Sequence, residues 1–294
     1  MWCAEHWTEY KLLDCSDGER LEKWGNYVLV RPDPQVIWKG EARHPAWRKP
    51  DAHYTRSAGG GGAWDANALP PEWTVSYSRL GLTFTVKPMG FKHTGIFPEQ
   101  AVNWDRMHAL ISKAVSAGRP VKVLNLFAYT GGATVACAKA GASVCHVDAS
   151  KGMVQMARVN AERSGLGAAP IRYIVDDCKK FAEREIRRGN LYDAIILDPP
   201  SYGRGPSGEV WKLEDQLGDL LALLSKPLSP DALFFLLNSY TTGLSASTMG
   251  CLLSLALPRP LGGHVASDEI GLPVTQTGLV LPCGASALWT SEKI

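Results

Sequence analysis

The fold of this chain is decided by one stretch, Val123-Leu124-Asn125-Leu126-Phe127-Ala128-Tyr129-Thr130-Gly131-Gly132. An apolar run that leads into two adjacent glycines is typical of a buried strand, a tight turn and the start of a helix. Such a turn lets a ligand lie close to the backbone at the helix N-terminus, although an ordinary strand-to-helix turn has the same pattern. The GxGxxG dinucleotide motif does not fit, because no glycine stands two residues before Gly131.

From residue 120 onward the chain alternates regularly between predicted strands and helices. The pattern predicts strands at 121–127, 143–147, 171–175, 192–197 and 232–237, and helices at 132–140, 151–164, 179–188, 213–224 and 245–257. Short apolar strands that alternate with amphipathic helices predict a parallel sheet covered on both faces. Ligands bind such sheets beyond the carboxyl ends of the strands, so the residues after each strand are the candidate site.

Polar residues follow each of the next three predicted strands. Asp148, 17 residues after Gly131, can accept both hydroxyl hydrogens of a ribose, and we expect Ser150 to cap the next helix in its place. One carboxylate of the pair Asp176-Asp177 can accept from an adenine amino group. The fourth strand is followed by a rigid turn, Asp198-Pro199-Pro200-Ser201-Tyr202, whose carbonyls can face a substrate amine and whose aromatic ring can stack on a base.

Together these motifs resemble the class I S-adenosylmethionine-dependent methyltransferases, nearest the bacterial large-subunit ribosomal RNA cytosine-C5 and guanine-N7 methyltransferase group. The resemblance covers about residues 85–290 and rests on residues 123–132, 147–150, 176–177 and 197–202. It implies an α/β, Rossmann-like sheet that is mostly parallel, with an antiparallel last strand in or near residues 281–286. It also implies S-adenosylmethionine as the cofactor, and we expect no metal.

The resemblance assigns residues as well. The segment Lys92-His93-Thr94-Gly95-Ile96-Phe97-Pro98-Glu99-Gln100 looks like the family segment that folds over the methionine end of the cofactor. By the same resemblance Asp148 would hold the ribose, Asp177 the adenine amino group, and Thr130 with Gly131 the methionine moiety. The expected cofactor-binding residues are Phe97, Gln100, Asn125, Phe127, Ala128, Thr130, Gly131, Asp148, Ala149, Ser150, Asp176, Asp177 and Asp198. The expected catalytic residues, which face cofactor and acceptor, are Asp198, Pro199, Pro200 and Tyr202.

Two departures from the family pattern bear on the target atom. Cytosine-C5 methylation needs a thiolate, and relatives carry a cysteine just after the fifth strand, whereas residues 237–243 contain none. Cys178, Cys251 and Cys283 are the alternatives, and each is more typical of an inert thiol. In adenine-N6 enzymes an aromatic residue follows Pro-Pro directly, but here Ser201 intervenes before Tyr202. Both chemistries are therefore disfavoured.

Residues 1–90 read as a small β-rich N-terminal domain, and residues 91–294 as the methyltransferase domain. Strands are expected at 27–30, 36–38, 74–77 and 82–86, with a loop at about 40–63. Seven of the ten tryptophans fall in this first part, where they are expected as core fillers or, alternatively, as a platform for stacking bases. Residues 1–80 do not match the RNA-binding module with which many relatives begin.

Composition narrows the class of protein. An apolar content of 45% in 294 residues excludes disorder and collagen-like structure. We expect no membrane span, because no apolar run nears about 20 residues, and no signal peptide at the N-terminus. Seven scattered cysteines predict free thiols in the cytoplasm. A net charge of +2 argues against permanent residence on nucleic acid.

The sequence therefore predicts transfer of a methyl group from S-adenosylmethionine to a base in RNA, with ribosomal RNA favoured. The alternatives are a methyltransferase that acts on a protein or small molecule, and a nicotinamide-dependent oxidoreductase. A third is a non-catalytic cofactor-binding protein that recruits partners through its Trp-rich N-terminal part. Assembly as a homodimer is left open.

Overall fold

The computed structural model of the chain describes residues 1–40, 44–57, 61–66, 69–204 and 210–291. Its contacts divide it into two compact units. The first comprises Met1–Val102 and Ile270–Cys283, and the second comprises Asn103–Glu269 and Gly284–Ile294. Two strands, β16 (His264–Pro273) and β17 (Val280–Thr290), contribute residues to both units. The domain boundary expected between residues 90 and 91 is a statement about independently folding domains. The two contact units do not test it, and it stays a prediction.

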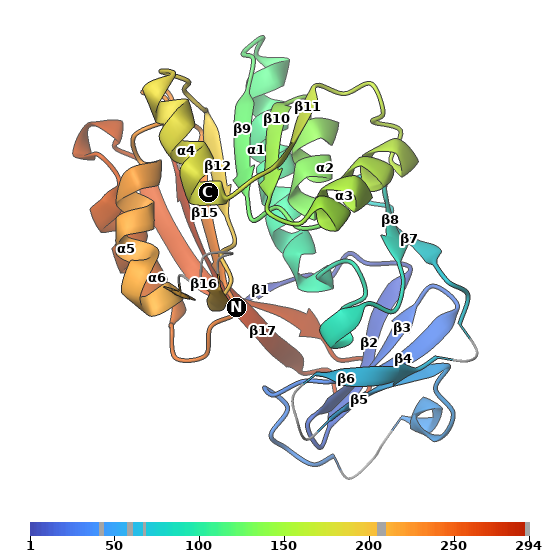
Figure 1. Cartoon of the computed structure of the whole chain (residues 1–294). Coiled ribbons are helices and arrows are strands. Elements are labelled where there is room, and N and C mark those ends of the chain that lie inside the picture. Colours follow the sequence, from blue (N-terminus) through green and yellow to red (C-terminus); the bar gives the residue numbers. More distant parts are fainter. Residues whose placement is uncertain (41–43, 58–60, 67–68, 205–209, 292–294) are drawn as a thin grey trace. The chain divides into compact units, whose positions relative to one another are not determined.

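The second unit is built on a sheet with the strand order β16-β17-β15-β12-β9-β10-β11 (Figure 1). Its inner strands are β9 (Lys122–Leu126), β10 (Ser143–Asp148), β11 (Ile171–Val175), β12 (Ala194–Leu197) and β15 (Phe234–Ser239). These five strands pair in parallel, and β17 runs antiparallel to β15. The predicted mostly parallel sheet with an antiparallel last strand is confirmed.

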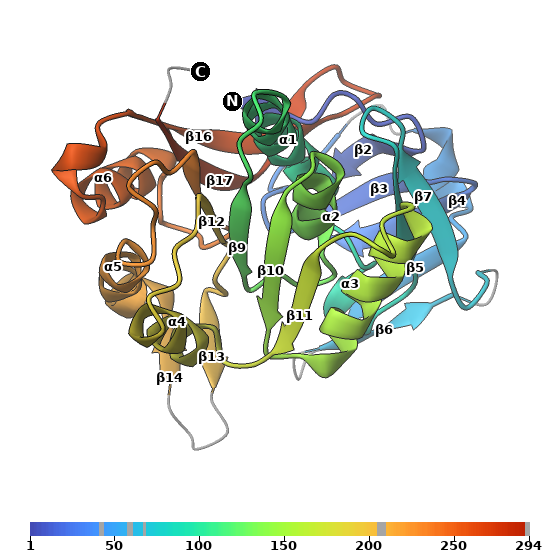
Figure 2. The ribbon, with the colours of Figure 1, turned by 90° about the horizontal axis from the view of Figure 1, so that it is seen from above.

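Helices cover this sheet on both faces, with α1 to α3 on one side and α4 to α6 on the other (Figure 2). They are α1 (Ala101–Ser116), α2 (Gly132–Lys139), α3 (Lys151–Arg163), α4 (Cys178–Arg187), α5 (Leu213–Leu224) and α6 (Ala246–Ala256). Helix α1 was not predicted, although its buried Trp104, Met107 and Ile111 recur at helical spacing. Helix α5 has the predicted bounds, because its leucines form a continuous apolar stripe.

The core of the second unit lies where the strands are buried on both faces. All four residues of β12 and all six of β15 are buried. Leu124, Ile195 and Phe235 belong to one apolar cluster with residues of α4, α5 and α6. Burial of apolar surface at about 25 cal/mol per Å² fixes these strands, and so fixes the level at which each one ends.

The first unit is β-rich, as expected. Its main sheet has the order β2-β3-β4-β5-β6, from β2 (Tyr10–Ser16), β3 (Glu19–Trp24), β4 (Tyr27–Pro32), β5 (Ala52–Arg56) and β6 (Gly62–Asp65). A separate hairpin pairs β7 (Trp73–Tyr77) with β8 (Leu82–Val86), and β1 (Trp2–Cys3) pairs with β16. Short 3₁₀ turns are η1 (Pro45–Arg48), η2 (Gly90–Lys92) and η3 (Pro98–Gln100), with η4 (Arg259–Leu261) in the second unit.

Two expectations for the first unit are wrong. Residues 36–38 form no strand; the nearby Pro32 and Pro34 cannot donate to a ladder. The stretch at 40–63 is not simply a loop, because η1 and β5 lie within it, while Gly59 and Gly60 lie outside the described residues.

Tryptophan rings fill part of this core. Trp24 is fully buried and Trp7 nearly so. The ring of Trp7 lies 4.8 Å from that of Tyr77, and the ring of Trp24 lies 4.6 Å from that of Tyr10, measured between centroids. The core-filler interpretation is confirmed for these two tryptophans, whereas Trp38 is exposed.

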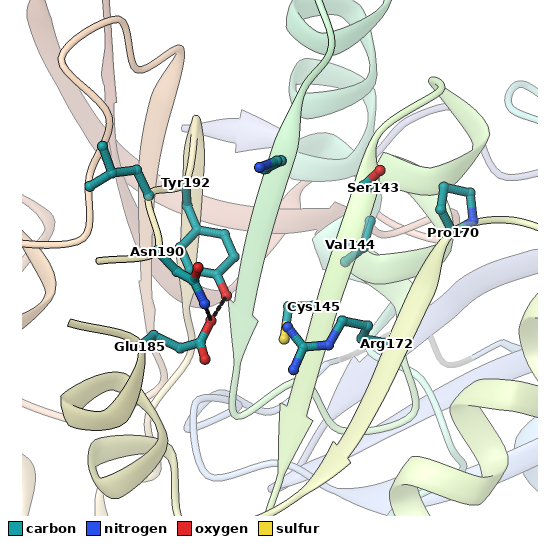
Figure 3. Close-up of a pocket in the computed structure, with 10 residues that line it drawn as sticks. Ser143, Val144, Cys145, Pro170, Arg172, Glu185, Asn190 and Tyr192 are labelled. Carbon is teal, nitrogen blue, oxygen red and sulfur yellow. Dashed lines mark hydrogen bonds between the residues drawn. The ribbon is translucent and has the colours of Figure 1, made fainter. Parts of the chain in front are cut away.

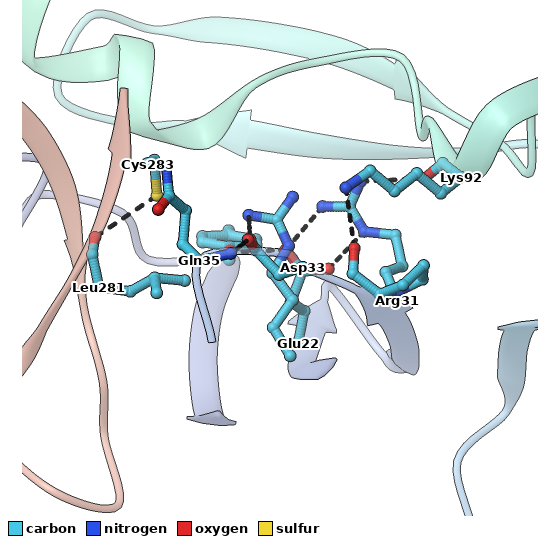
Figure 4. Close-up of polar contacts among 10 residues, drawn as sticks. Glu22, Arg31, Asp33, Gln35, Lys92, Leu281 and Cys283 are labelled. Atoms are coloured by element: carbon cyan, nitrogen blue, oxygen red, sulfur yellow. Dashed lines mark hydrogen bonds and ion pairs between the residues drawn. The ribbon is translucent and has the colours of Figure 1, made fainter. Parts of the chain in front are cut away.

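A buried ion pair ties β3 to β4 in the first unit (Figure 4). Arg31 donates from Nε to Glu22 Oε2 at 2.5 Å and from Nη2 to Oε1 at 2.7 Å, and both side chains are buried. Burial alone would raise the pKa of Glu22, but the charges of Arg20 and Arg31 hold it at about 2. The pair therefore stabilises the fold above the ordinary glutamate pKa of about 4.3, and this contribution is lost as pH falls toward 2.

We expect Arg31→Met to destabilise the protein by about 3 kcal/mol at pH 7, because it leaves the Glu22 carboxylate buried without its main partner. Urea denaturation followed by tryptophan fluorescence measures this loss. Arg48→Met, at an exposed position, should change the free energy of unfolding by less than about 0.5 kcal/mol. Equal losses in the two variants would contradict the role given to the pair.

Candidate functional site

The register of the parallel strands brings their carboxyl ends to one edge of the sheet. Leu126 at the end of β9 pairs with Val147 of β10 and with Leu197 at the end of β12. Asp148 at the end of β10 pairs with Val175 at the end of β11. Phe127, Asp148, Asp176 and Asp198 stand at or directly after these strand ends. Because the chain continues from β9 to β10 on one side and returns through β12 on the other, β9 and β12 form the topological switch point.

The loop after β9 has a strained backbone. Phe127 and Tyr129 have φ values of 54° and 49°, in the left-handed region that non-glycine residues rarely adopt, and Gly131 follows at 84°. Each such residue costs about 1–3 kcal/mol and persists only where surrounding contacts hold it, which is common at ligand sites. The loop is therefore the strongest structural indication of a binding site at this edge.

Hydrogen bonds from neighbouring strand ends hold the loop in this conformation. The amide of Ala128 donates to the carbonyl of Val147 at 3.1 Å, and the amide of Tyr129 donates to Asp148 Oδ2 at 2.9 Å. The amide of Phe127 lies 3.2 Å from Cys178 Sγ, which accepts it. The strand β10 and the start of α4 thus determine the shape of the loop after β9.

Asp148 is the charged group at the centre of this arrangement. Its Oδ1 accepts from the amide of Ser150 at 2.8 Å, in addition to the bond from Tyr129. Ser150 occupies the N-cap position of α3, but its side chain makes no capping hydrogen bond. The expectation that Ser150 caps the helix and leaves Asp148 free is therefore wrong. A carboxylate offers about four acceptor positions, so Asp148 can accept from further donors.

The turn after β12 is closed by a hairpin that the sequence did not predict. Strands β13 (Tyr202–Arg204) and β14 (Val210–Lys212) pair, with Gly203 opposite Trp211. The indole Nε1 of Trp211 donates to the carbonyl of Pro200 at 2.6 Å. One of the two lone pairs of that carbonyl is thus used, and the expectation that a carbonyl of this turn faces a substrate amine stays a prediction. The Trp211 ring lies 6.4 Å from the Phe127 ring, and Tyr202 is 52% exposed.

Comparison with known proteins agrees with this geometry. The sequence model of the S-adenosylmethionine-dependent methyltransferases matches residues 68–232 of the 294. The chain belongs to this family. A crystal structure of an S-adenosylmethionine-dependent methyltransferase from Agrobacterium tumefaciens is 39% identical, with a TM-score of 0.89, and the match covers 98% of this chain and 92% of that one. The Rossmann-like methyltransferase fold and the cofactor predicted from sequence are confirmed.

Curated relatives match over a shorter stretch. Ribosomal RNA large subunit methyltransferase I of Aeromonas salmonicida is 38% identical over 133 residues, which are 45% of this chain and 32% of that protein. Ribosomal RNA large subunit methyltransferase K/L of Shewanella frigidimarina is 31% identical over 160 residues, 53% of this chain and 21% of that protein. The chain thus spans about a third or less of the length of these relatives.

A buried chain of hydrogen-bonded side chains links β9, α2 and β10 next to the loop at 127–131. Asn125 donates from Nδ2 to Thr134 Oγ1 at 2.9 Å, and that oxygen lies 2.9 Å from His146 Nδ1. Burial lowers the pKa of His146 to about 4, so its ring is neutral at pH 7. The Asn125 side chain ties α2 to the sheet, and its expected contact with the cofactor stays a prediction. The carbonyl of Thr130 accepts from Asn160 Nδ2 at 2.9 Å, which fixes the turn before Gly131 from the same side.

Both residues of the acidic pair after β11, Asp176 and Asp177, interact with helix α4. Asp177 is its N-cap, and its Oδ1 accepts from the amide of Lys180 at 2.8 Å. Asp176 pairs with Arg184 and accepts the amide of Asp177. Ala149 and Ser150, after β10, are exposed at the same edge. The assignment of Asp177 to an adenine amino group stays a prediction that would use its second oxygen.

Phe97 and Gln100 belong to the first unit, which is described by itself. Gln100 is buried at the end of η3, and Phe97 is half-buried with its ring 5.6 Å from the His93 ring. The indole of Trp7 donates to the carbonyl of Pro98 at 2.9 Å, and Arg31 donates to the carbonyl of Lys92 at 3.1 Å. These bonds fix the segment at 92–100 within its unit, and its role at the cofactor stays a prediction.

Two of the three candidate cysteine nucleophiles, Cys178 and Cys283, are poorly suited to attack a base. Burial raises the pKa of Cys178 to about 12, so this thiol stays protonated at pH 7. Burial also raises the pKa of Cys283, whose thiol donates to the carbonyl of Leu281 (Figure 4). Cys251 is exposed on α6.

A cavity of about 200 Å³ opens at the opposite, amino-terminal edge of the same sheet (Figure 3). Its buried carboxylate, Glu185, accepts from Tyr192 Oη at 2.6 Å, from Asn190 Nδ2 at 2.8 Å and from Arg188 at 2.9 Å. Burial opposes the charge, but these hydrogen bonds hold the pKa of Glu185 below its ordinary range. Because they satisfy the carboxylate, we read this cavity as structural rather than as the cofactor site.

Gly131→Ala should destabilise the protein more than Gly118→Ala does. Both glycines have a left-handed φ, of 84° and 82°, so both variants lose about 1–2 kcal/mol to backbone strain. At residue 131 a Cβ would also lie 2.8 Å from the Cβ of Ala157, whereas at residue 118 it would meet nothing within 4 Å. Urea denaturation should show a further loss of about 1–3 kcal/mol for Gly131→Ala. Equal losses would show that the turn can move away from α3.

Proposed function

We propose that this chain transfers a methyl group from S-adenosylmethionine to a base in RNA, and that the RNA is ribosomal. Membership of the methyltransferase family supports the reaction. The names of the relatives from Aeromonas salmonicida and Shewanella frigidimarina support the acceptor. The observation that carries the proposal is the strained loop at 127–131, held by Asp148 at the switch point of the sheet.

The residues at this edge fit the cofactor. The Asp148 carboxylate has acceptor capacity for the two hydroxyls of the ribose, beyond its bonds to Tyr129 and Ser150. Gly131 and Thr130 would lie against the methionine moiety, and Asp177 would accept from the adenine amino group. The sulfonium of the cofactor supplies an already activated methyl group, so the protein mainly has to align donor and acceptor.

The acceptor base would be positioned by the turn after β12. Asp198 would accept from an amine of the acceptor or orient the cofactor, while Pro199 and Pro200 keep the backbone rigid. We add Trp211 to the expected Tyr202 as an aromatic wall for the base, because its indole bond to Pro200 fixes its ring beside this turn. The high pKa of Cys178 argues against a thiolate adduct, and so against cytosine C5 as the target atom.

We also propose a cytoplasmic location. All seven cysteines are free thiols, as expected of a protein in a reducing compartment. Within the described residues no helix is both long and apolar enough to cross a membrane.

Asp148→Asn should weaken the binding of S-adenosylmethionine by about 5- to 150-fold, which corresponds to about 1–3 kcal/mol for hydrogen bonds to a charged group. Isothermal titration calorimetry measures the change. Asp219→Asn, which removes the same charge from an exposed position on α5, should bind the cofactor as the wild type does. An unchanged dissociation constant for Asp148→Asn would remove Asp148 from the cofactor site.

The acceptor is tested by incubating the protein with tritiated S-adenosylmethionine and fractionated RNA and protein from a strain that lacks the gene. We expect label in large-subunit ribosomal RNA, and nucleoside analysis then identifies the base. Label in protein or small molecules alone would overturn the RNA acceptor and leave the methyltransferase. No label in any fraction, with the cofactor still bound, would favour a non-catalytic cofactor-binding protein.

A further inference from the structure

The first unit contains a groove of about 460 Å³, a volume within the range of small-ligand pockets. It lies between the hairpin of β3 and β4, the adjacent β2, and the edge of β7. The residues that line it and matter here are Lys11, Lys23, Asn26, Tyr27, Trp73 and Ser76. None of them was assigned to the cofactor or to the acceptor turn.

Two of the residues that line this groove are lysines on adjacent strands. Lys11 of β2 and Lys23 of β3 are direct partners in the antiparallel ladder, and both are exposed. They share the outer face, because the alternate residues Tyr10 and Trp24 point into the core. Like charges placed directly opposite each other destabilise a strand pair. An anion bound between the two lysines attracts both of them and so offsets their repulsion.

Among the described residues that line the groove, Glu9 is the acidic one, and its carboxylate binds the backbone. Glu9 Oε2 accepts from the amide of Ser76 at 2.6 Å. Its charge is partly compensated by this bond, so the two lysines determine the attraction for an anion.

The groove also has a fixed aromatic pair. The rings of Tyr27 and Trp73 meet edge to face with centroids 5.0 Å apart, and each side chain is half-exposed. The Trp73 indole donates to the carbonyl of Trp24 at 3.1 Å, which holds its ring in place. The turn before Tyr27 is tight, because Gly25 adopts a φ of 62°, as the first central residue of a type II′ hairpin turn does.

We propose that this groove binds a single-stranded segment of RNA, with a phosphate between Lys11 and Lys23 and a base against Tyr27 and Trp73. Paired cations beside aromatic rings are the elements with which proteins hold single strands without reading their sequence. Asn26 and Ser76 offer further polar groups for phosphate or ribose. The inference deepens the proposed function and rests on it, because the strand held here would belong to the RNA acceptor.

The test is fluorescence anisotropy with a fluorescein-labelled oligouridylate of about 12 nucleotides, within the site sizes of such grooves. We expect Lys11→Ala/Lys23→Ala to weaken binding about tenfold or more at low salt. The slope of log Kd against log salt should fall by about 0.7, since the variant loses the one phosphate contact that the two lysines share. The control is Lys39→Ala/Lys49→Ala, which removes the same charge from exposed positions of the same unit outside the groove.

A second pair of variants tests the aromatic part. Tyr27→Leu should weaken binding about 5- to 150-fold, whereas Tyr27→Phe, which keeps the ring, should bind as the wild type does. Equal affinity in the groove and control lysine variants would overturn the inference, whatever the methyl-transfer assay shows. An acidic peptide that displaces the oligonucleotide from the groove, and binds more tightly, would overturn it in favour of a protein ligand. If label from the cofactor enters protein alone, the proposed RNA acceptor fails independently of this binding measurement.

Discussion

The candidate site depends on one constraint, the register of the parallel strands around β9. Leu126 pairs with Val147 on one side and with Leu197 on the other. Strands whose ends are up to 71 residues apart in sequence therefore end at the same edge of the sheet. The apolar cluster beneath fixes this register, because a slip of one residue would turn buried side chains to the opposite face. Loops placed on so rigid a base can hold strained conformations.

Hydrogen bonds from several neighbouring elements hold the strained loop in place. The left-handed Phe127 and Tyr129 are held by Cys178 and Asp148, which lie on neighbouring elements. Asp148 therefore has two tasks: it anchors the loop through one oxygen, and it remains able to accept from a ligand. This explains how a single carboxylate at a strand end can shape a pocket and bind within it. In the same way, the hydrogen bond from the Trp211 indole to the carbonyl of Pro200 holds the Pro-Pro turn in place.

Much of this arrangement could be predicted from sequence, wherever an apolar pattern determines the strand or helix. The five parallel strands and α5 are apolar enough to be recognised without contacts. The strand β3 was missed because buried Glu22 and its partner Arg31 look like surface residues until their ion pair is seen. The hairpin β13–β14 was missed because three-residue strands are stabilised by pairing rather than by an apolar pattern. The bonds to Asp148 could not be predicted, because they follow from left-handed backbone at non-glycine residues.

The central claim is that the cofactor binds at the carboxyl edge of the sheet and not at the cavity on the amino edge. Hydrogen exchange measured with and without S-adenosylmethionine tests it directly, since both edges are read in one experiment. We predict slower exchange at the amides of residues 127–132, 148–150 and 176–178, with no change at 143–145 and 190–192. Protection confined to residues around Glu185 and Tyr192, or no protection at saturating cofactor, would contradict the claim.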